Sequence, residues 1–136
     1  MSAANTIGFG IVGTGMIANY HAKAIKALSE KLDIHLIGAL DNVLDRARDF
    51  AQKNDVPFCT DSAEVFFANP AIQVVCITTP SGAHLEPALQ AIQAGKHLIV
   101  EKPLEITVER VDAMLAAAHK AQVKVAAIFQ ARLSRG

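Results

Sequence analysis

One unit recurs along the whole chain: a short run rich in β-branched residues, then a turn, then a segment with apolar residues at helical spacing. Alternating strands and helices join through right-handed crossovers, which place the strands side by side and mostly parallel. The pattern therefore predicts an α/β fold, a doubly wound, mainly parallel Rossmann sheet of about six strands with helices on both faces. The expected strands are residues 7–12, 34–40, 57–59, 72–78, 96–100 and 123–129.

Capping residues and apolar stripes place helices between these strands. Asn42 is the expected N-cap of a helix over residues 42–53, and Thr107 is that of the last helix. The segment Asp61-Ser62-Ala63-Glu64 has the form of a capping box for a short helix that ends near residue 68, and Gly95 suits a helix C-terminus. The residues expected to face the core are Ile17, Ala24, Ile25 and Leu28 in the first helix and Val108, Val111, Leu115 and Ala118 in the last.

Two overlapping registers near the N-terminus match the pattern Gly-x-Gly-x-x-Gly/Ala, which is typical of dinucleotide-binding turns. The first spans residues 8–13, but the segment before it is not a buried strand. The second, Gly13-Thr14-Gly15-Met16-Ile17-Ala18, lies between an apolar strand and a helical stripe, which is the context that such a turn needs. Here Gly13 allows the tight turn, Gly15 lets a pyrophosphate approach the backbone, and Ala18 keeps the helix close to the strand.

An acidic residue ends the second expected strand. Asp41 follows the glycine motif by about 20 residues, the spacing at which a carboxylate binds the ribose hydroxyls of adenosine. A carboxylate there also repels a 2′-phosphate, so it favours NAD over NADP. Two alternatives stay open: Asp41 or Asn42 only caps the next helix, or Arg46, one turn further on, binds the 2′-phosphate of NADP.

Polar residues follow the fourth and fifth expected strands, at the edge of the sheet where ligands bind in such folds. Thr78, Thr79 and Pro80 offer hydroxyl groups and a rigid turn directly after the most strand-like run of the chain. Lys102 follows the next strand, where a lysine in a cleft can act as an acid, a base or a stabiliser of charge. On chemistry alone, a solvated surface position is the commoner one for a lysine.

Three further segments follow the glycine motif in order: Thr79-Pro80 with His84, Ala94-Gly95-Lys96-His97, and Glu101-Lys102-Pro103-Leu104. With that motif they resemble the Gfo/Idh/MocA oxidoreductases, the relatives of glucose–fructose oxidoreductase and inositol dehydrogenase. The resemblance covers residues 7–132, and its last two segments are far more specific than the glycine motif. It implies an NAD(P)-dependent dehydrogenase that acts on a secondary hydroxyl of a sugar, a cyclitol or a related polyol.

The resemblance also assigns site residues by position. Lys102 matches the family's catalytic lysine, which lies near the nicotinamide ribose and the substrate hydroxyl, and its bond to Pro103 is commonly cis in the family. Glu101 matches a residue at the nicotinamide end, residues 78–80 lie along the cofactor, and His84 lies close by. With NAD as the expected cofactor and NADP as the alternative, the expected binding residues are Gly13, Thr14, Gly15, Met16, Ile17, Asp41, Asn42, Arg46, Thr78, Thr79, Pro80, His84, Glu101, Lys102 and Pro103.

The resemblance further implies a second domain, which we expect to lie outside residues 1–136. Residues 1–129 are expected to form the NAD(P)-binding domain, and residues 130–136 the start of the crossover to a C-terminal α+β domain. In the family that domain commonly supplies a histidine as the principal base and the interface of a homo-oligomer. We therefore expect this chain alone to bind NAD weakly and to oxidise no substrate.

Charge and composition argue against other classes of function. Thirteen basic and thirteen acidic side chains give a formal net charge of zero, and with one Tyr and no Trp this does not favour nucleic-acid binding. No apolar run approaches the roughly 20 residues of a membrane span, and the first residues show no basic region before an apolar one, so no export signal is expected. Cys59 and Cys76 suit a reducing cytoplasm. His21, His35, His97 and His119 show no metal-ligand spacing and are expected to be structural or surface residues, so no metal is expected.

Two other functions stay open at this point. One is a non-catalytic member of the same family that senses NAD(P) or regulates partners. The other is a different nucleotide-binding Rossmann domain, such as one for coenzyme A. The intact Glu101-Lys102-Pro103 segment favours the enzyme, because a sensor has less use for a positioned lysine, and Asp41 counts against coenzyme A.

Overall fold

All six strands run parallel in one sheet, in the order β3-β2-β1-β4-β5-β6. The computed structural model describes residues 6–129, so the expected crossover at 130–136 lies outside the described residues. The order reverses between the neighbouring strands β1 and β4, which is where ligands bind in open parallel sheets. The strands are β1 (Ile7–Val12), β2 (Ile34–Leu40), β3 (Phe58–Thr60), β4 (Val74–Ile77), β5 (His97–Val100) and β6 (Val125–Ala127).

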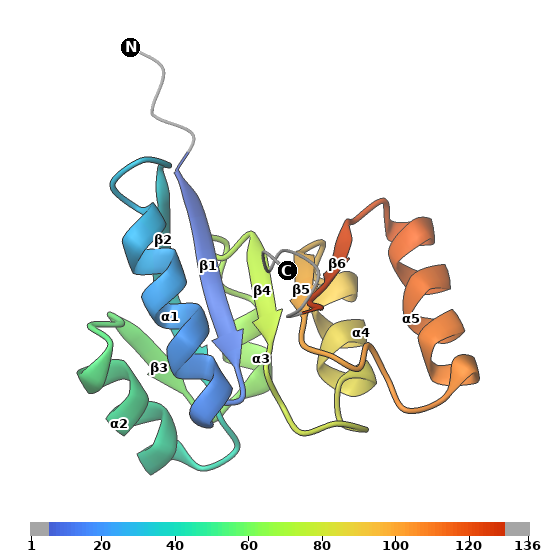
Figure 1. The fold of residues 1–136 in the computed structure, drawn as a ribbon, viewed down its shortest axis with the longest axis horizontal. Helices are drawn as coiled ribbons and strands as arrows, with labels where there is room; N and C mark the ends of the chain where they lie inside the picture. Colours follow the sequence, from blue (N-terminus) through green and yellow to red (C-terminus); the bar gives the residue numbers. More distant parts are fainter. Residues whose placement is uncertain (1–5, 130–136) are drawn as a thin grey trace, which may run out of the picture.

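Helices cover both faces of this sheet (Figure 1). On one face lie α1 (Met16–Leu28) and α2 (Leu44–Lys53), and on the other lie α3 (Ala63–Phe67) and α4 (Leu85–Gln93), with α5 (Val108–Ala121) beside α4. Neighbouring strand residues accordingly serve different cores: Ile11 and Cys76 pack under α1, whereas Val12 and Val75 pack towards α3 and α4. Burial on both faces explains why the central strands are apolar at every position.

Local capping signals are confirmed at some helix ends and wrong at others. The Thr107 hydroxyl accepts from the backbone N–H of Arg110 at the start of α5, and Gly95 follows α4 with φ +75°. In contrast, α2 begins after Val43 and Asn42 does not cap it. Before α3, the residue that caps is Ser62, whose hydroxyl accepts from the N–H of Val65, so the helix begins one residue later than the predicted capping box implies.

The buried faces of α1 and α5 differ from the predicted stripes. Helix α1 buries Ala18, Ala22 and Ile25, while Ala24 and Leu28 are exposed. The small alanine side chains let this helix lie close to the strands. The position of its larger apolar side chains therefore does not predict which face is buried. In α5 the buried residues are Met114 and Ala118, because the helix packs beside α4 and buries only a narrow strip. The predicted core residues Val108 and Leu115 are 71% and 44% exposed.

A ring from α3 fills a hollow in the sheet. Phe66 is completely buried and stands over Gly10 of β1 and Gly38 of β2. A Cβ atom at Gly10 would lie 2.5 Å from the Cζ atom of Phe66, and one at Gly38 would lie 2.8 Å from Cδ1 of Ile72. Gly10, which belongs to the first glycine register, is therefore needed for packing within the sheet.

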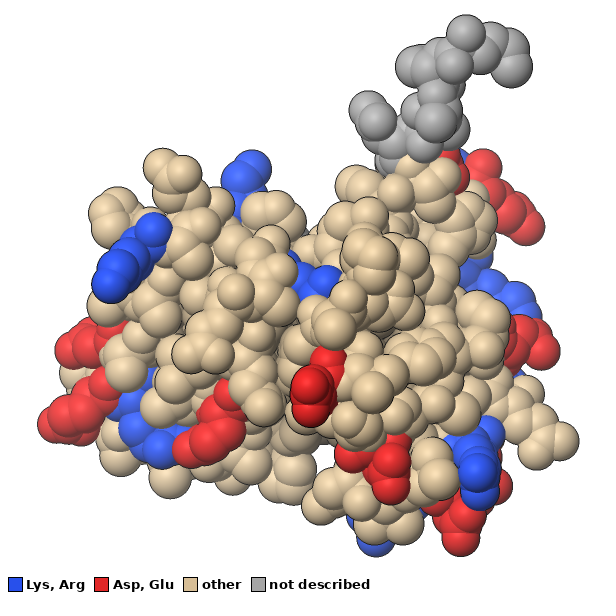
Figure 2. Space-filling model, turned by 180° about the vertical axis from the view of Figure 1, so that it is seen from behind, with Lys and Arg blue, Asp and Glu red and all other residues tan. Residues whose placement is uncertain are grey.

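Charges are mixed on the surface. Seen from behind, the molecule has acidic and basic side chains scattered over a mostly uncharged face, and neither sign forms a continuous patch (Figure 2). Such an arrangement gives no electrostatic footprint for a nucleic-acid backbone on this face. Among the helices of residues 6–129, none combines the length and the apolar character that crossing a bilayer requires.

Candidate functional site

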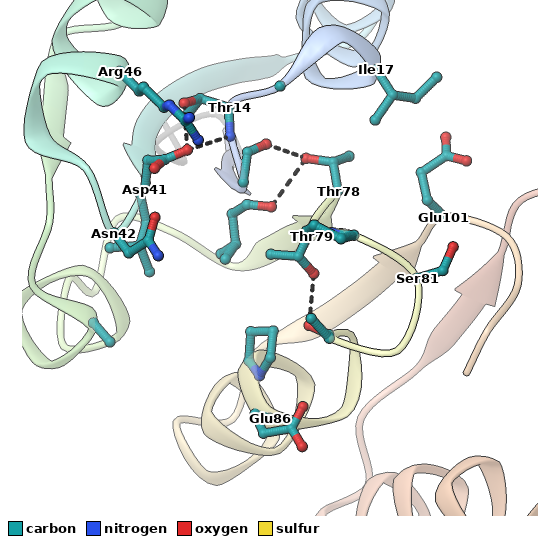
Figure 3. Close-up of a pocket in the computed structure, with 18 of the residues that line it drawn as sticks. Thr14, Ile17, Asp41, Asn42, Arg46, Thr78, Thr79, Ser81, Glu86 and Glu101 are labelled. Carbon is teal, nitrogen blue, oxygen red and sulfur yellow. Dashed lines mark hydrogen bonds between the residues drawn. The ribbon is translucent and has the colours of Figure 1, made fainter. Parts of the chain in front are cut away.

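A groove of about 950 Å³ opens at the carboxyl ends of the central strands. Its size lies in the range of small-molecule and cofactor sites. Figure 3 shows how strands distant in sequence contribute to it, with Asp41, Asn42 and Arg46 on one side of Thr14 and Glu101 on the other. The expected residues that line it are Gly13, Thr14, Gly15, Met16, Ile17, Asp41, Asn42, Arg46, Thr78, Thr79, Pro80, Glu101 and Lys102.

The glycine turn connects β1 to α1 at the floor of the groove. Gly13 has φ +89°, and a Cβ atom there would lie 2.8 Å from the backbone nitrogen of Thr79. Its N–H donates to the carbonyl of Leu40, and its carbonyl accepts from the Thr78 hydroxyl at 2.6 Å. The tight turn is thus the one at Gly13, as the second register predicts, and it is bound to β2 on one side and to β4 on the other.

The start of α1 has the features of an anion site. Gly15 is the N-cap residue, and it has no side chain that could cap the N–H groups of the first turn. A Cβ atom built on Gly15 would meet no atom of residues 6–129 within 4 Å, so these residues leave the space above this backbone open. These features fit the pyrophosphate of a dinucleotide, which binds to N–H groups at the positive end of a helix dipole.

Asp41 is held firmly at the end of β2. Its Oδ2 atom accepts from the backbone N–H and the hydroxyl of Thr14, at 3.1 and 2.8 Å, and Oδ1 accepts from the N–H of Val43 at 2.9 Å. Burial alone would raise the pKa of Asp41, but these hydrogen bonds and the charge of Arg46 lower it below its usual value. The carboxylate is therefore ionised, and it is Val43, not Asp41 or Asn42, that occupies the N-cap position of α2.

His84 and Pro103 do not line the groove. His84 is 1% exposed, with Nε2 at 2.9 Å from the carbonyl oxygen of Thr79 and Nδ1 at 2.8 Å from that of Pro103. The imidazole thus joins the loop after β4 to the segment after β5 instead of facing a ligand. The contact between cofactor and His84 that the resemblance implies has no counterpart in the groove lining, because the ring is enclosed by protein backbone on both sides.

The end of β5 brings a carboxylate and an amine to the groove. Lys102 is exposed there and its bond to Pro103 is cis, as the resemblance implies. Glu101 is 7% exposed, and its Oε1 atom lies 2.7 Å from Nε2 of His21 on α1. From its sequence context His21 is expected to be a structural or surface residue, and no motif predicts this pair. Its position could have been noticed in the sequence, because His21 lies one helical turn after Ile17, a residue of the glycine motif.

Helix α4 contributes a wall that no sequence motif predicts. The wall consists of Ser81 in the preceding loop and Glu86, Pro87 and Gln90 in the helix. The last three recur at helical spacing, so one face of α4 borders the groove. Which face of α4 borders the groove depends on how the helix packs against the sheet, and no local motif predicts that packing.

Glu105 fixes the start of this helix. Its Oε2 atom accepts from the N–H groups of His84 and Leu85, at 3.1 and 2.9 Å, and from Arg110 at 3.2 Å, while Oε1 accepts from the N–H of Ile106. Burial alone would raise the pKa of Glu105, but Arg110 and the backbone N–H groups lower it to about 2. A carboxylate from the segment after β5 thereby replaces the missing side-chain cap of α4.

A metal centre has no candidate in the described part of the chain, since residues 6–129 contain no group of three or more His, Cys, Asp or Glu residues that could hold an ion. Cys76 is buried in β4, and Cys59 is partly buried. The groove therefore offers hydrogen-bonding and charged groups, but no arranged set of metal ligands among these residues.

Comparison with known proteins agrees with this geometry. Residues 7–129 match the model of an oxidoreductase family with an NAD-binding Rossmann fold. The chain is 34% identical to an uncharacterised oxidoreductase from Synechocystis over 90% of this chain and 32% of that protein. It is 40% identical to an inositol 2-dehydrogenase from Gluconacetobacter diazotrophicus over 73% of this chain and 29% of that protein.

A solved structure shows the same fold. The WlbA dehydrogenase from Bordetella pertussis, in complex with NADH and UDP-GlcNAcA, superimposes with a TM-score of 0.89 at 26% identity, over 96% of this chain and 38% of that one. The chain spans about a third of the length of these relatives. Because the family model matches nearly all of the described residues, the chain belongs to the Gfo/Idh/MocA family of oxidoreductases and is an NAD(P)-binding Rossmann domain of that family.

Proposed function

We propose that this chain is the cofactor-binding part of a dehydrogenase that transfers hydride between NAD and a secondary hydroxyl of a sugar, a cyclitol or a related polyol. The observation that carries the proposal is that one groove holds Asp41 and Lys102 on opposite sides of the glycine turn. In this proposal Asp41 binds the ribose and Lys102 is the catalytic amine, and both line the same groove as Gly15 at the phosphate site. The names of relatives, an inositol dehydrogenase and a dehydrogenase bound to a sugar nucleotide, support the substrate class.

The strand order sets the direction of the cofactor in this proposal. Asp41 follows β2, which lies on one side of β1, and Lys102 follows β5, which lies beyond β4 on the other side. Three strand spacings, about 14 Å, separate β2 from β5. With the adenosine ribose at Asp41 and the pyrophosphate at Gly15, the nicotinamide half extends over the ends of β4 and β5, past Thr79.

The chemistry then falls to Lys102. NAD bound in this groove would supply the acceptor or the donor of the hydride. Lys102 donates a hydrogen bond to the substrate oxygen, which stabilises the charge that develops there as the hydroxyl proton leaves. The resemblance implies that the principal base belongs to a second domain, so residues 1–136 alone should bind NAD and oxidise no polyol.

Calorimetric titration tests the cofactor part of the proposal. Asp41 is ionised and has a free acceptor site on Oδ1, so the chain should bind NAD more tightly than NADP. Asp41→Ala should reduce this preference, whereas Asp45→Ala, which removes an exposed carboxylate of α2, should leave it unchanged. Unchanged discrimination between the two cofactors in Asp41→Ala would contradict the ribose role.

A kinetic test addresses the catalytic part. In a protein that also contains the second domain, Lys102→Ala should abolish polyol oxidation and keep NAD binding, and Lys53→Ala, an exposed lysine of α2, should change neither. Full oxidation by Lys102→Ala would refute the lysine's role. If the unmodified protein binds NAD but oxidises no polyol, the domain serves a regulatory member of the family instead.

A further inference from the structure

A histidine and a carboxylate that are far apart in the sequence meet beside the groove. His21 of α1 and Glu101, the residue after β5, are 80 positions apart, and their side chains are 14% and 9% exposed. A carboxylate can only accept hydrogen bonds, so the Nε2 atom of His21 carries the hydrogen of this 2.7 Å contact. In Figure 3 the carboxylate of Glu101 points towards α1, where Ile17 lies on the first turn.

The second oxygen of Glu101 is also held. Its Oε2 atom accepts from the backbone N–H of Lys102 at 3.3 Å. The carboxylate therefore has a donor at each oxygen, one from α1 and one from the strand end that presents Lys102. Because α1 begins at the glycine turn, the His21 contact connects the helix at the proposed phosphate site to the strand end that carries Lys102.

The charge of this carboxylate acts on its surroundings. Burial raises the pKa of the Cys76 thiol to about 12, and the negative charge of Glu101 adds to the rise. The other charged residues that line the groove are Lys102, which is exposed, and Asp41, Arg46, Asp61 and Glu86. Glu101 is thus a fixed anion at the end of the groove opposite to Asp41.

The two redox states of a nicotinamide differ at this end of the groove. The oxidised ring carries a positive charge, and the reduced ring is neutral. An anion fixed nearby attracts the first and not the second, with an effect on binding on the order of tenfold for charges about 8 Å apart at a protein surface. The effect needs the carboxylate to stay in place, because a freely rotating side chain moves into water, where its charge is screened.

We propose that Glu101 makes the groove prefer oxidised over reduced cofactor, and that His21 is the positioning residue that holds its carboxylate there. The inference rests on the proposed direction of NAD in the groove. It assigns a role to a histidine that neither the sequence motifs nor the lysine chemistry requires. Lys102 carries the opposite charge at the same edge, but it is unchanged in every variant used below.

The test measures the ratio of the dissociation constants of NADH and NAD for residues 1–136, by calorimetry at about pH 8, above the range in which histidines change charge. Glu101→Gln should lower this ratio by about threefold to tenfold. His21→Leu removes the donor and should lower the ratio similarly, while His21→Gln keeps a donor at a similar reach and should restore it. His35→Gln is the matched control, because Nε2 of His35 faces the carboxylate of Asp33 at 3.3 Å in an exposed pair away from the groove.

The outcomes separate the two proposals. Thermal unfolding by circular dichroism first establishes that each variant is folded. An unchanged ratio in Glu101→Gln, with NAD still bound by the unmodified chain, overturns this inference alone. A ratio that falls in Glu101→Gln but not in His21→Leu overturns the positioning role of His21. Failure of the unmodified chain to bind either cofactor overturns the proposed function, and this inference with it.

Discussion

The carboxylate of Glu105 offers a sharp test of how the fold holds the loops around the groove. Glu105→Gln keeps the size of the side chain but removes its charge. It also turns an NH2 group towards one of the donors that bond to the carboxylate oxygens in the unmodified chain. These donors are the N–H groups of His84, Leu85 and Ile106, together with Arg110. A hydrogen bond to a buried charged group contributes about 1.5–3 kcal/mol, and a charge at a helix N-terminus adds up to about 1 kcal/mol. Since the amide oxygen still accepts from some donors, we expect a loss of about 2–3 kcal/mol in the free energy of unfolding.

The loss should depend on pH with a defined sign. The pKa of Glu105 is lowered to about 2 in the folded protein from an ordinary value of 4.5. A lowered pKa means that the carboxylate stabilises the fold at pH values above about 4.5, and that this contribution is lost as the pH falls from there towards 2. The stabilities of the unmodified chain and of Glu105→Gln should therefore differ most at neutral pH and converge below about pH 4.

Urea unfolding followed by far-UV circular dichroism measures both effects, since the chain has no Trp for fluorescence. Glu86→Gln is the control, because Glu86 bonds to the same Arg110 at 2.7 Å but has a side chain that is 64% exposed, and exposed ion pairs contribute little. Equal losses in the two variants would refute the reasoning. So would a loss in Glu105→Gln that stays constant down to about pH 3.

Three further predictions concern other parts of the domain. Gly13→Ala should lower the free energy of unfolding in urea by about 2 kcal/mol or more, because its φ is +89°. Gly15→Ala should fold normally but bind NAD at least about tenfold more weakly in calorimetry. Equal stability of the two variants would contradict the assigned turn. A thiol reagent should label Cys59 but not the buried Cys76 until urea is added, and labelling of both in the native chain would contradict the packing of β4. Thr107→Ala should cost about 1 kcal/mol in urea through the lost cap of α5, and no loss would show that the cap is dispensable.

The architecture could be predicted because it depends on patterns within short segments. The run at residues 34–40 coincides with β2, and the glycine turn lies in the register chosen from the strand before it and the helix after it. The run at 72–78 is longer than β4 (Val74–Ile77), since ladder pairing with β1 begins at Val74. Inward helix faces were predicted less well, because an apolar stripe does not say how much of a helix its neighbour covers, as Leu115 shows.

The site could be predicted as a set of positions but not as a set of contacts. Asp41 and Lys102 follow from spacing and motif, and both line the groove. The contact of Thr14 with Asp41 joins residues 27 apart, and that of His21 with Glu101 joins residues 80 apart. Such pairs depend on which strand ends become neighbours, so they require the fold. His84 shows the converse, since its place in a motif does not reveal that protein backbone encloses its ring.

The fit of Phe66 over Gly10 has a consequence for how this family can vary. The two positions share one fixed volume, because the ring occupies the space that any side chain at position 10 would need. A larger residue at position 10 is therefore tolerable only with a smaller one at position 66, as volume-conserving exchanges in cores are. In an alignment of relatives the two positions should change together. A glycine at position 10 should accompany a large ring at position 66 whether or not the relative binds a nucleotide.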